Sequence, residues 1–221
     1  MEAAKYKILG SDYIGVFATA TDDFVFVGAG MTSNSKEMIA KTLGVKYIDM
    51  SVSSSDLVGL FVKANSNGML LSNLMLDHEI EAIEKKGLGI SVKVMESELN
   101  ALGSNILAND KMAIINPDYS KKDEQDISDT LGVETIRAKI DGFKTVGANN
   151  ILTNTGLALN NKATAQEKND WDRITGFDSI LTTANTGAMA IGLSVIANSK
   201  GVIVGDTTTG FEMARIIDAL E

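Results

Sequence analysis

Residues 103–115 read GSNILANDKMAII, and this stretch contains the pattern that decides the fold. A glycine is followed by a short apolar segment, an Asn-Asp-Lys turn and, ten residues after the glycine, a second apolar run. The same arrangement starts at Gly15, Gly59, Gly147 and Gly192, so that the five glycines are 44, 44, 44 and 45 residues apart. Five such units fill the chain of 221 residues, which indicates a repeat architecture.

Each unit reads as a strand, a tight turn, a second strand, a helix and a third strand. Asn and Gly in the turns, as in residues 65–68, indicate hairpins whose turns need positive φ angles. A Ser or Thr with an acid three residues later marks a helix start at Ser120, Thr164 and Thr209, and Asp77 is the predicted cap of the second helix. The predicted helix ends are Gly44, Gly87, Gly132 and Gly176, and the predicted third strands cover residues 45–50, 90–95, 133–139 and 177–183.

The fifth unit has no third strand of its own, because its helix ends at Leu220 and the sequence ends at Glu221. Residues 5–9, in turn, precede the first glycine without belonging to a unit. The economical solution is that this N-terminal strand completes the fifth unit and closes a ring, which also protects the sheet edges. We therefore predict an α/β protein, a closed five-fold pseudo-symmetric α/β propeller of ββαβ units, with residues 1–221 forming a single domain.

Composition excludes several classes of function. The chain has 20 basic and 29 acidic residues, a formal net charge of −9, which argues against a protein that coats nucleic acid. It has no cysteine and one histidine, which excludes disulfides, cysteine nucleophiles and histidine-rich metal sites. The N-terminus has no secretory signal, and the uncharged residues 179–199 are too rich in Ser, Thr and Asn for a membrane span. A cytoplasmic protein is expected.

The other candidate chemical groups have simpler interpretations. We interpret His78 as a solvated residue in the first turn of a helix. The neighbouring acids Asp22 and Asp23, and likewise Glu79 and Glu81, are interpreted as solvated faces. No pattern of residues supports an enzyme, so a binding protein is the predicted class.

A five-fold ring of ββαβ units resembles the pentein fold. One branch of that fold contains enzymes that modify guanidinium groups with a nucleophilic cysteine, a mechanism that this cysteine-free chain cannot use. The other branch is the translation initiation factor 6 family, and the sequence resembles its archaeal members along nearly its whole length. The matching segments are ALGSN and ANDK within residues 101–111, TVGAN and TNTG within 145–156, and IANSKG and GDTT within 196–208. The family often has a proline after several second strands, and here only Pro117 retains it.

The resemblance implies a non-catalytic protein that binds the joining face of the large ribosomal subunit and sterically blocks the small subunit. Family members dock mainly on a basic ribosomal protein, near the ribosomal RNA stem-loop that stimulates translational GTPases. Their release depends on other factors, including an elongation-factor-like GTPase. No cofactor or metal is implied, and a monomer is expected. By similarity, the partner-binding residues at one rim of the ring are Leu60, Asn65, Ser104, Asn105, Ala148 and Asn149.

Two alternatives remain open at this point. The ring could bind a different protein partner, which a pull-down without ribosomal material would favour. It could also be a pentein-like enzyme with chemistry that needs no cysteine, which turnover of guanidino compounds would reveal.

Overall fold

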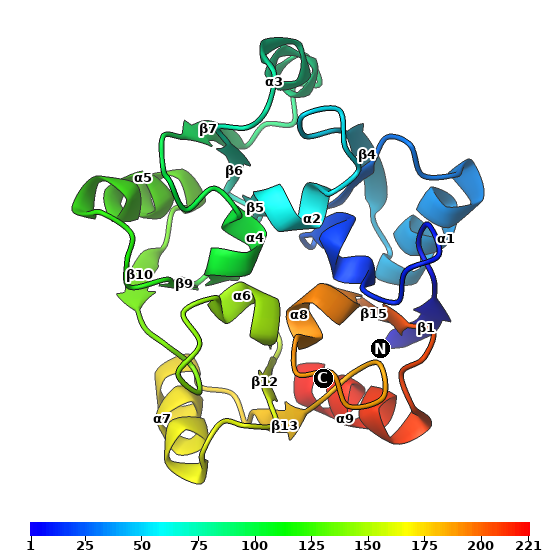
Figure 1. The fold of residues 1–221 in the computed structure, drawn as a ribbon, viewed down its shortest axis with the longest axis vertical. Helices are drawn as coiled ribbons and strands as arrows, with labels where there is room; N and C mark the ends of the chain where they lie inside the picture. Colours follow the sequence, from blue (N-terminus) through cyan, green and yellow to red (C-terminus); the bar gives the residue numbers. More distant parts are fainter.

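The computed structural model describes residues 1–221 and contains five three-stranded sheets arranged around a central axis (Figure 1). The strands are β1 (Glu2–Tyr6), β2 (Ala18–Ala20), β3 (Phe24–Gly28), β4 (Lys46–Met50), β5 (Val62–Ala64), β6 (Gly68–Ser72), β7 (Ser91–Met95), β8 (Ile106–Ala108), β9 (Met112–Ile115), β10 (Glu134–Arg137), β11 (Ile151–Leu152), β12 (Leu157–Asn160), β13 (Ile180–Thr182), β14 (Val195–Ala197) and β15 (Gly201–Gly205). The five long helices are α1 (Ser33–Leu43), α3 (Asp77–Glu84), α5 (Lys121–Leu131), α7 (Ala165–Thr175) and α9 (Gly210–Leu220). The five one-turn helices are η1 (Ile14–Val16), α2 (Val58–Phe61), α4 (Leu102–Asn105), α6 (Val146–Asn149) and α8 (Ile191–Ser194).

The sheets confirm the predicted ββαβ order. In the first unit β2 pairs with β3 in antiparallel fashion, and β4 pairs with the other side of β3 in parallel. In every sheet the second strand of the hairpin is the middle strand. In the first four units the long helix connects the two parallel strands, and all five long helices lie on the outside of the ring (Figure 1). The fold is therefore a ring of five α/β units.

The N-terminal strand completes the fifth sheet, as predicted. β1 pairs in parallel with β15, from Glu2 opposite Gly201 to Tyr6 opposite Gly205. The strand covers Glu2–Tyr6 rather than residues 5–9, because Ile8 already belongs to the next loop, where it forms an isolated bridge with Ser11 and packs into the core. The two chain termini consequently lie close together at one side of the ring (Figure 1).

The five repeated glycines form a ring of their own around the axis. Each lies in a one-turn helix, and a Cβ atom on Gly103 would come within 1.8 Å of the carbonyl oxygen of Gly59. Each of the other repeated glycines lies similarly close to the one before it. The ring closes because a Cβ atom on Gly15 would lie 2.4 Å from the carbonyl oxygen of Gly192. Only glycine allows five backbones to approach so closely, which explains the 44-residue spacing.

The hairpin turns differ from the prediction, because none of their residues has a positive φ. Instead, the side chain of Asn65 accepts hydrogen bonds from the N–H groups of Asn67 and Gly68, both at 3.0 Å, and so forms the turn. The glycine is required for space, since a Cβ on Gly68 would lie 1.9 Å from the carbonyl oxygen of Thr130 at the end of α5. Positive φ angles occur instead at helix ends, as at Gly132, and in loops at the opposite ends of the strands, as at Ser53 and Ser54.

The helix boundaries confirm most of the predicted caps. Ser120, Thr164 and Thr209 are N-caps with capping boxes, and α1, α5 and α7 end at left-handed glycines. The second helix differs: its N-cap is Leu76, and Asp77 is the first helical residue. The carboxylate of Glu79 accepts the N–H of this N-cap residue at 2.9 Å. This helix also ends at Glu84, before the predicted Gly87.

Five hydrophobic clusters lie between the helices and the sheets, and neighbouring units share them. The cluster beneath α1, for example, contains Val25 and Ile39 of the first unit together with Ile203 of β15. Each unit therefore buries part of its apolar surface against a neighbouring unit. None of the helices combines the length and the apolar character that crossing a membrane requires.

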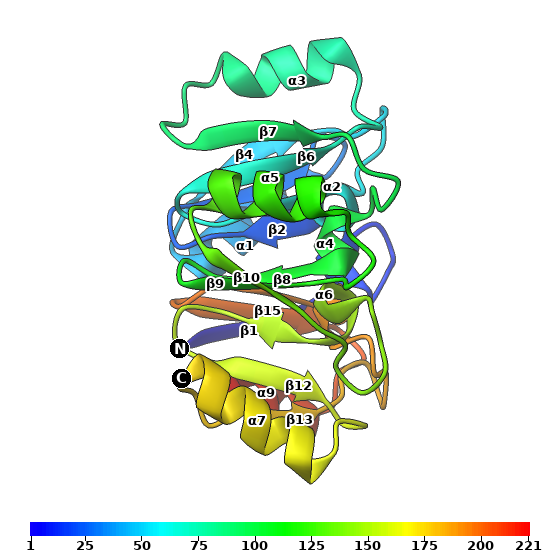
Figure 2. The ribbon, with the colours of Figure 1, turned by 90° about the vertical axis from the view of Figure 1, so that its left-hand side faces the viewer.

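The ring has two different faces. The one-turn helices and the N-terminal ends of the long helices lie at one face, which we call the helix face (Figure 2). The five hairpin turns lie at the other face, which we call the turn face. The middle and outer strands run parallel and end at the helix face, so the loops that follow them gather there.

Candidate functional site

Exposed apolar side chains are concentrated on the helix face. Seven large hydrophobic residues are exposed, and six of them belong to loops or helix starts of this face. The six residues are Leu9, Tyr13, Leu74, Leu76, Met189 and Phe211. The seventh, Ile174, lies near the end of α7 at the turn face. Clustering of exposed apolar side chains at one end of a molecule, rather than exposure as such, is typical of interaction surfaces.

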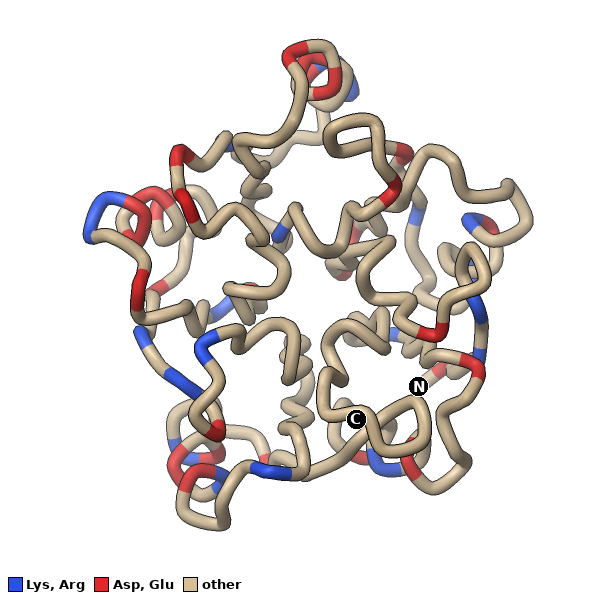
Figure 3. The backbone as a smooth tube through the Cα atoms, viewed as in Figure 1, with Lys and Arg blue, Asp and Glu red and all other residues tan.

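The centre of the helix face also lacks charge. The one-turn helices read IGV, VGLF, LGSN, VGAN and IGLS, without a single acidic or basic residue. Figure 3 shows that most Lys, Arg, Asp and Glu residues lie around the periphery of the ring. A partner could cover the centre without removing a charged group from water, which is a large part of the cost of forming an interface.

An acidic pocket lies at the helix face, between the second and third units. It has a volume of about 390 Å³ and lies between the loop that follows β7 and the loop that follows β9. Its lining includes the four carboxylates of Glu96, Glu98, Asp118 and Asp123 and the single amine of Lys122. The excess of acid matches the net charge of the chain and favours a basic partner.

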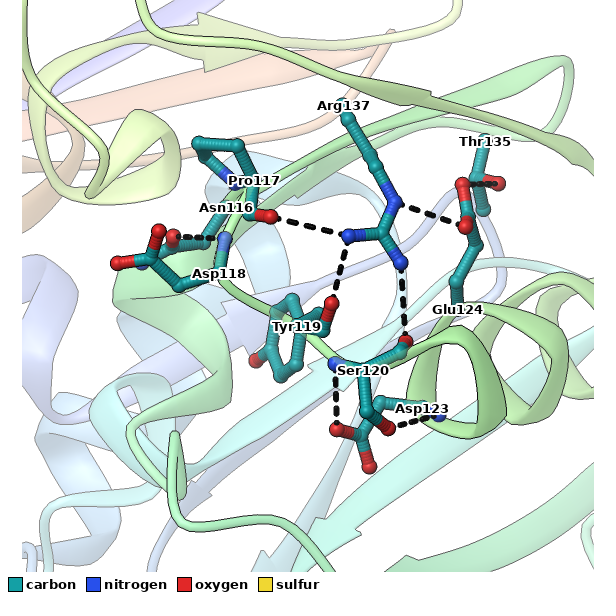
Figure 4. Close-up of polar contacts among 9 residues, drawn as sticks. All are labelled: Asn116, Pro117, Asp118, Tyr119, Ser120, Asp123, Glu124, Thr135 and Arg137. Atoms are coloured by element: carbon teal, nitrogen blue, oxygen red, sulfur yellow. Dashed lines mark hydrogen bonds and ion pairs between the residues drawn. The ribbon is translucent and has the colours of Figure 1, made fainter.

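Arg137 holds one wall of this pocket in place (Figure 4). Its guanidinium group donates to the carbonyl oxygens of Pro117, Tyr119 and Ser120, at 2.9, 2.6 and 3.0 Å. The same group donates to Glu124 of α5 at 2.8 Å. No sequence pattern predicts this role of Arg137, because its partners are 13 to 20 residues away and follow no motif.

Three glutamates, Glu79, Glu167 and Glu212, hold three further loops of the helix face. Each is the third residue of a long helix, where it accepts the N–H of its own N-cap residue, and each also reaches a loop about 25 residues earlier. Glu79 accepts the N–H groups of Ser53 and Ser54, both at 2.8 Å, and Glu167 accepts that of Asp141 at 2.8 Å. Glu79 is only 5% exposed, which corrects its interpretation as part of a solvated face.

The hydrogen bonds keep these glutamates ionised. Burial raises the pKa of Glu79, but bonds from Leu76, Ser54 and Ser53 outweigh it and leave the pKa below its usual value. The bond from Thr164 likewise lowers the pKa of Glu167.

Five of the six predicted partner-binding residues lie in the one-turn helices. Leu60 is half-buried in α2, whereas Ser104, Asn105, Ala148 and Asn149 are 5–7% exposed in α4 and α6. The two asparagine side chains are used internally, since Asn105 donates to the carbonyl oxygen of Ala101 at 2.9 Å and Asn149 to that of Thr145 at 3.0 Å. The structure therefore brings these five together, with Leu60 the most accessible.

Asn65 lies elsewhere. It is 3% exposed at the turn face, where its side-chain amide donates to the carbonyl oxygens of Asn109 at 3.0 Å and Leu131 at 2.8 Å. Asp22, interpreted from the sequence as solvated, is also engaged at this face, because it accepts hydrogen bonds from Asn154 and from Ser199. The exposed Tyr13 and Met189, in contrast, lie on the helix face, and no sequence pattern identified them.

Comparisons with known proteins agree in one assignment. The model of the eIF-6 family matches residues 3–219. Translation initiation factor 6 of Pyrococcus horikoshii is 38% identical, and the alignment covers 100% of this chain and 99% of the relative. The protein of the same name from Saccharolobus islandicus is 35% identical with the same coverage, and that of Picrophilus torridus is 34% identical over 98% of both chains.

Proposed function

The chain belongs to the eIF-6 family of translation initiation factors, and from this membership we propose that it binds the large ribosomal subunit at its joining face and sterically prevents association with the small subunit. This activity needs no chemical step, so we propose a non-catalytic factor that works in the cytoplasm. Release would depend on other factors, including an elongation-factor-like GTPase.

The observation that carries the proposal is the composition of the helix face. Its centre is free of charge, six exposed apolar side chains lie on the same face, and an acidic pocket lies there between the second and third units. Stable interfaces combine an apolar centre with a polar rim, and opposite charges on the partner increase the association rate. A basic ribosomal protein beside ribosomal RNA offers the complementary surface, and the net charge of −9 disfavours direct binding to bare phosphates.

We assign the contacts to the helix face and, within it, to the accessible side chains. Of the six predicted partner-binding residues, Leu60 is the one whose side chain is accessible enough to contact a partner. Tyr13 (44% exposed) and Met189 extend the same surface. Ser104, Asn105, Ala148 and Asn149 would shape the helices beneath this surface. Asn65 would contribute to the ring at the turn face rather than to the contact.

Sedimentation of the purified protein with archaeal ribosomal subunits tests the proposal. We expect it to migrate with the large subunit alone and to reduce the amount of joined ribosomes. Tyr13→Arg combined with Leu60→Arg should weaken binding by at least about tenfold, because it places charge at the centre of the interface. Ile174→Arg is the matched control, since it changes an equally exposed apolar residue at the turn face and should bind like the wild type.

Two results would contradict the proposal in different ways. If the protein does not migrate with the large subunit even at low salt, where electrostatic attraction is strongest, the ribosome is not its partner. If the double variant binds like the wild type while Ile174→Arg does not, the turn face makes the contact. Melting temperatures of all variants show whether a loss of binding reflects unfolding.

A further inference from the structure

The turn face has five positions where the end of a long helix faces the hairpin of the preceding unit, and we call these positions seams. At three seams the helix packs directly on a glycine of the hairpin. A Cβ atom on Gly68 would lie 1.9 Å from the carbonyl oxygen of Thr130 in α5, and a Cβ atom on Gly201 would lie 2.0 Å from that of Thr42 in α1. The third pair is Gly156 and α9. Each of these three helices ends in a fully buried leucine, which is Leu43, Leu131 or Leu220.

The seam between the first and second units is built differently. Helix α3 has 8 residues, whereas the other long helices have 11. At the distance from the N-cap where three helices have leucine, the second unit has Gly87, and nothing lies within 4 Å of a Cβ atom placed there. The hairpin opposite carries Phe24 at the position that Gly68 holds in the second unit, since each directly precedes the first residue paired across its hairpin. The helix end therefore does not close this seam.

Hydrogen bonds from hairpin side chains join the units at the other four seams. The amide of Asn198 donates to the carbonyl oxygens of Thr21 and Leu43, both at 3.0 Å, and so joins the fifth hairpin to the first hairpin and to α1. The side chains with this role at the remaining three seams are Asn65, Asn109 and Thr155. The hydroxyl group of Thr21, in contrast, donates to Phe24 of its own turn at 3.3 Å. No hydrogen bond joins the first hairpin to α3 or to the second hairpin.

An open groove of about 780 Å³ lies at this seam. It is bounded by the end of α1, the start of β4 and the loop between α3 and β7. Its large apolar residues are all half-buried, and they are Phe24, Val45, Leu88 and Ile90. The groove therefore presents apolar side chains at a position that the end of a helix covers at three other seams.

The groove is positively charged, although the chain has a formal net charge of −9. Its lining contains two lysines, Lys41 and Lys46, and a single carboxylate, that of Asp23. Both lysines are exposed. The lysines that form ion pairs are others, namely Lys7, Lys36, Lys85, Lys93, Lys144 and Lys168. Lys41 and Lys46 are therefore free to pair with acidic groups of another molecule.

We propose that this groove binds a short acidic segment of a partner protein, with an aliphatic side chain on the apolar residues and carboxylates beside Lys41 and Lys46. The ring itself shows which chemistry suits a seam, because α5 and α9 have an aspartate, Asp129 or Asp218, two residues before the buried leucine. Apolar anchors in a groove, flanked by complementary charges, are a common mode of peptide recognition. Because the groove lies at the turn face, a segment bound there leaves the helix face free for another partner.

The test uses a synthetic peptide of residues 120–132, the segment that closes the seam between the second and third units. This peptide contains four acidic and two basic residues together with Leu131. It is added to nitrogen-15-labelled protein, and binding is followed by nuclear magnetic resonance at the amide groups of Gly44 and Gly89, which line the groove. We expect saturable shifts of both signals with a Kd below about 1 mM. The signal of Gly142, in a loop of the helix face, should not move.

Variants of both molecules make the result specific. Lys41→Glu combined with Lys46→Glu should weaken binding at least about tenfold, because it reverses the charge of the groove. A peptide with Leu131→Ser should also bind at least about tenfold more weakly, because it lacks the aliphatic anchor. Lys139→Glu combined with Lys162→Glu is the matched control, since it makes the same change in charge at exposed lysines outside the groove and should bind like the wild type. Melting temperatures show that the variants remain folded.

The proposal is overturned if the peptide produces no saturable shift of Gly44 and Gly89 at concentrations up to about 2 mM. It is also overturned if the groove variant, or the Leu131→Ser peptide, binds as tightly as the unchanged pair. A short single-stranded RNA is titrated separately, and tighter binding of the RNA at the same two glycines would assign the groove to phosphate groups instead of a peptide. All of these experiments use the free protein, so their outcome does not depend on ribosome binding.

Discussion

A glutamate at the third position of a long helix has two functions in this ring. Glu212 of α9 accepts the N–H of Thr209 at 2.8 Å and thereby completes the helix cap. The same carboxylate accepts the hydroxyl group of Thr183 and the N–H of Gly187, both at 2.7 Å. These bonds hold a loop in which Thr186 has a φ of 62°, a conformation that is costly for a residue other than glycine. One side chain therefore stabilises a helix start and a strained loop of the helix face.

The charge of Glu212 should contribute measurably to stability. Burial alone raises its pKa, but hydrogen bonds from Thr183, Thr209 and Gly187 outweigh burial and lower the pKa to about 2. Relative to the usual value of 4.5, this corresponds to roughly 3 kcal/mol at neutral pH. Since glutamine keeps one oxygen acceptor, we expect Glu212→Gln to lower the free energy of unfolding by about 2 kcal/mol at pH 7.

The pH dependence has a definite sign. The folded state holds the ionised form more strongly than the unfolded state does, so the contribution is complete above about pH 4.5 and is lost as the pH falls towards 2. Urea unfolding at pH 7, 4 and 2.5 should therefore show a difference between wild type and Glu212→Gln that shrinks with acid. Glu134→Gln, at an exposed glutamate without a hydrogen bond, is the control. A constant difference across this range would show that the charge is not responsible.

The sequence predicts only one of the two functions of Glu212. Thr209 followed by Glu212 is a local pattern, and the cap that it predicts is present. The contact with Gly187 joins residues 25 positions apart, and no local pattern encodes it.

At the scale of elements, the one-turn helices are the part that no sequence pattern predicts. Four-residue helices such as VGLF of α2 are too short for a hydrophobic period, so the segments read as the beginnings of strands. The longer elements were predictable, because capping boxes and left-handed glycines mark their ends. The repeated glycines were found from their spacing, and the structure adds the reason: each one-turn helix packs directly on the backbone of the next.

The packing of these helices predicts that alanine cannot replace the repeated glycines. A Cβ at position 103 would lie 1.8 Å from the carbonyl oxygen of Gly59, and backbone atoms cannot move away without opening the ring. We expect Gly103→Ala to lower the free energy of unfolding by more than about 3 kcal/mol. Gly210→Ala makes the same chemical change in α9, where nothing lies within 4 Å, and should leave stability unchanged or slightly raised.

Urea unfolding of the two variants measures this difference directly. Equal stability of Gly103→Ala and Gly210→Ala would show that the glycine ring tolerates a methyl group, and the explanation of the 44-residue spacing would then fail. Circular dichroism before unfolding distinguishes a weakened ring from a chain that has not folded.

At the scale of the whole molecule, closure determines where the candidate contacts lie. Leu60 and Asn65 are five residues apart, but the strand between them carries the chain from the helix face to the turn face, roughly 15 Å at about 3.3 Å per residue. Their proximity in the sequence therefore does not place them on one surface. The clustering of exposed apolar residues on the helix face is likewise a property of the assembled ring, to which loops from several units contribute.

Closure also predicts the effect of removing the first strand. β1 covers one edge of β15, whose sequence GVIVG is entirely buried. Without residues 1–6 this edge would present unpaired backbone groups on an apolar strand, which favours association with other chains. We expect the wild type to unfold in one transition as a monomer, because the clusters are shared between units. The shortened chain should melt at least about 10 °C lower and self-associate in size-exclusion chromatography.

A synthetic peptide of residues 1–8 provides the control for this experiment. If the loss results from the missing strand pairing, the peptide should bind the shortened chain, return it to a monomer and raise its melting temperature. A peptide in which Ala4 is replaced by proline lacks a backbone donor in the middle of the strand and should restore much less. A shortened chain that is monomeric and melts at the wild-type temperature would mean that the four complete units and β14–β15 hold the ring together without β1. In that case the pairing of Glu2–Tyr6 with β15 would be an addition to a ring already stable, and its role would be to cover an edge rather than to close the fold.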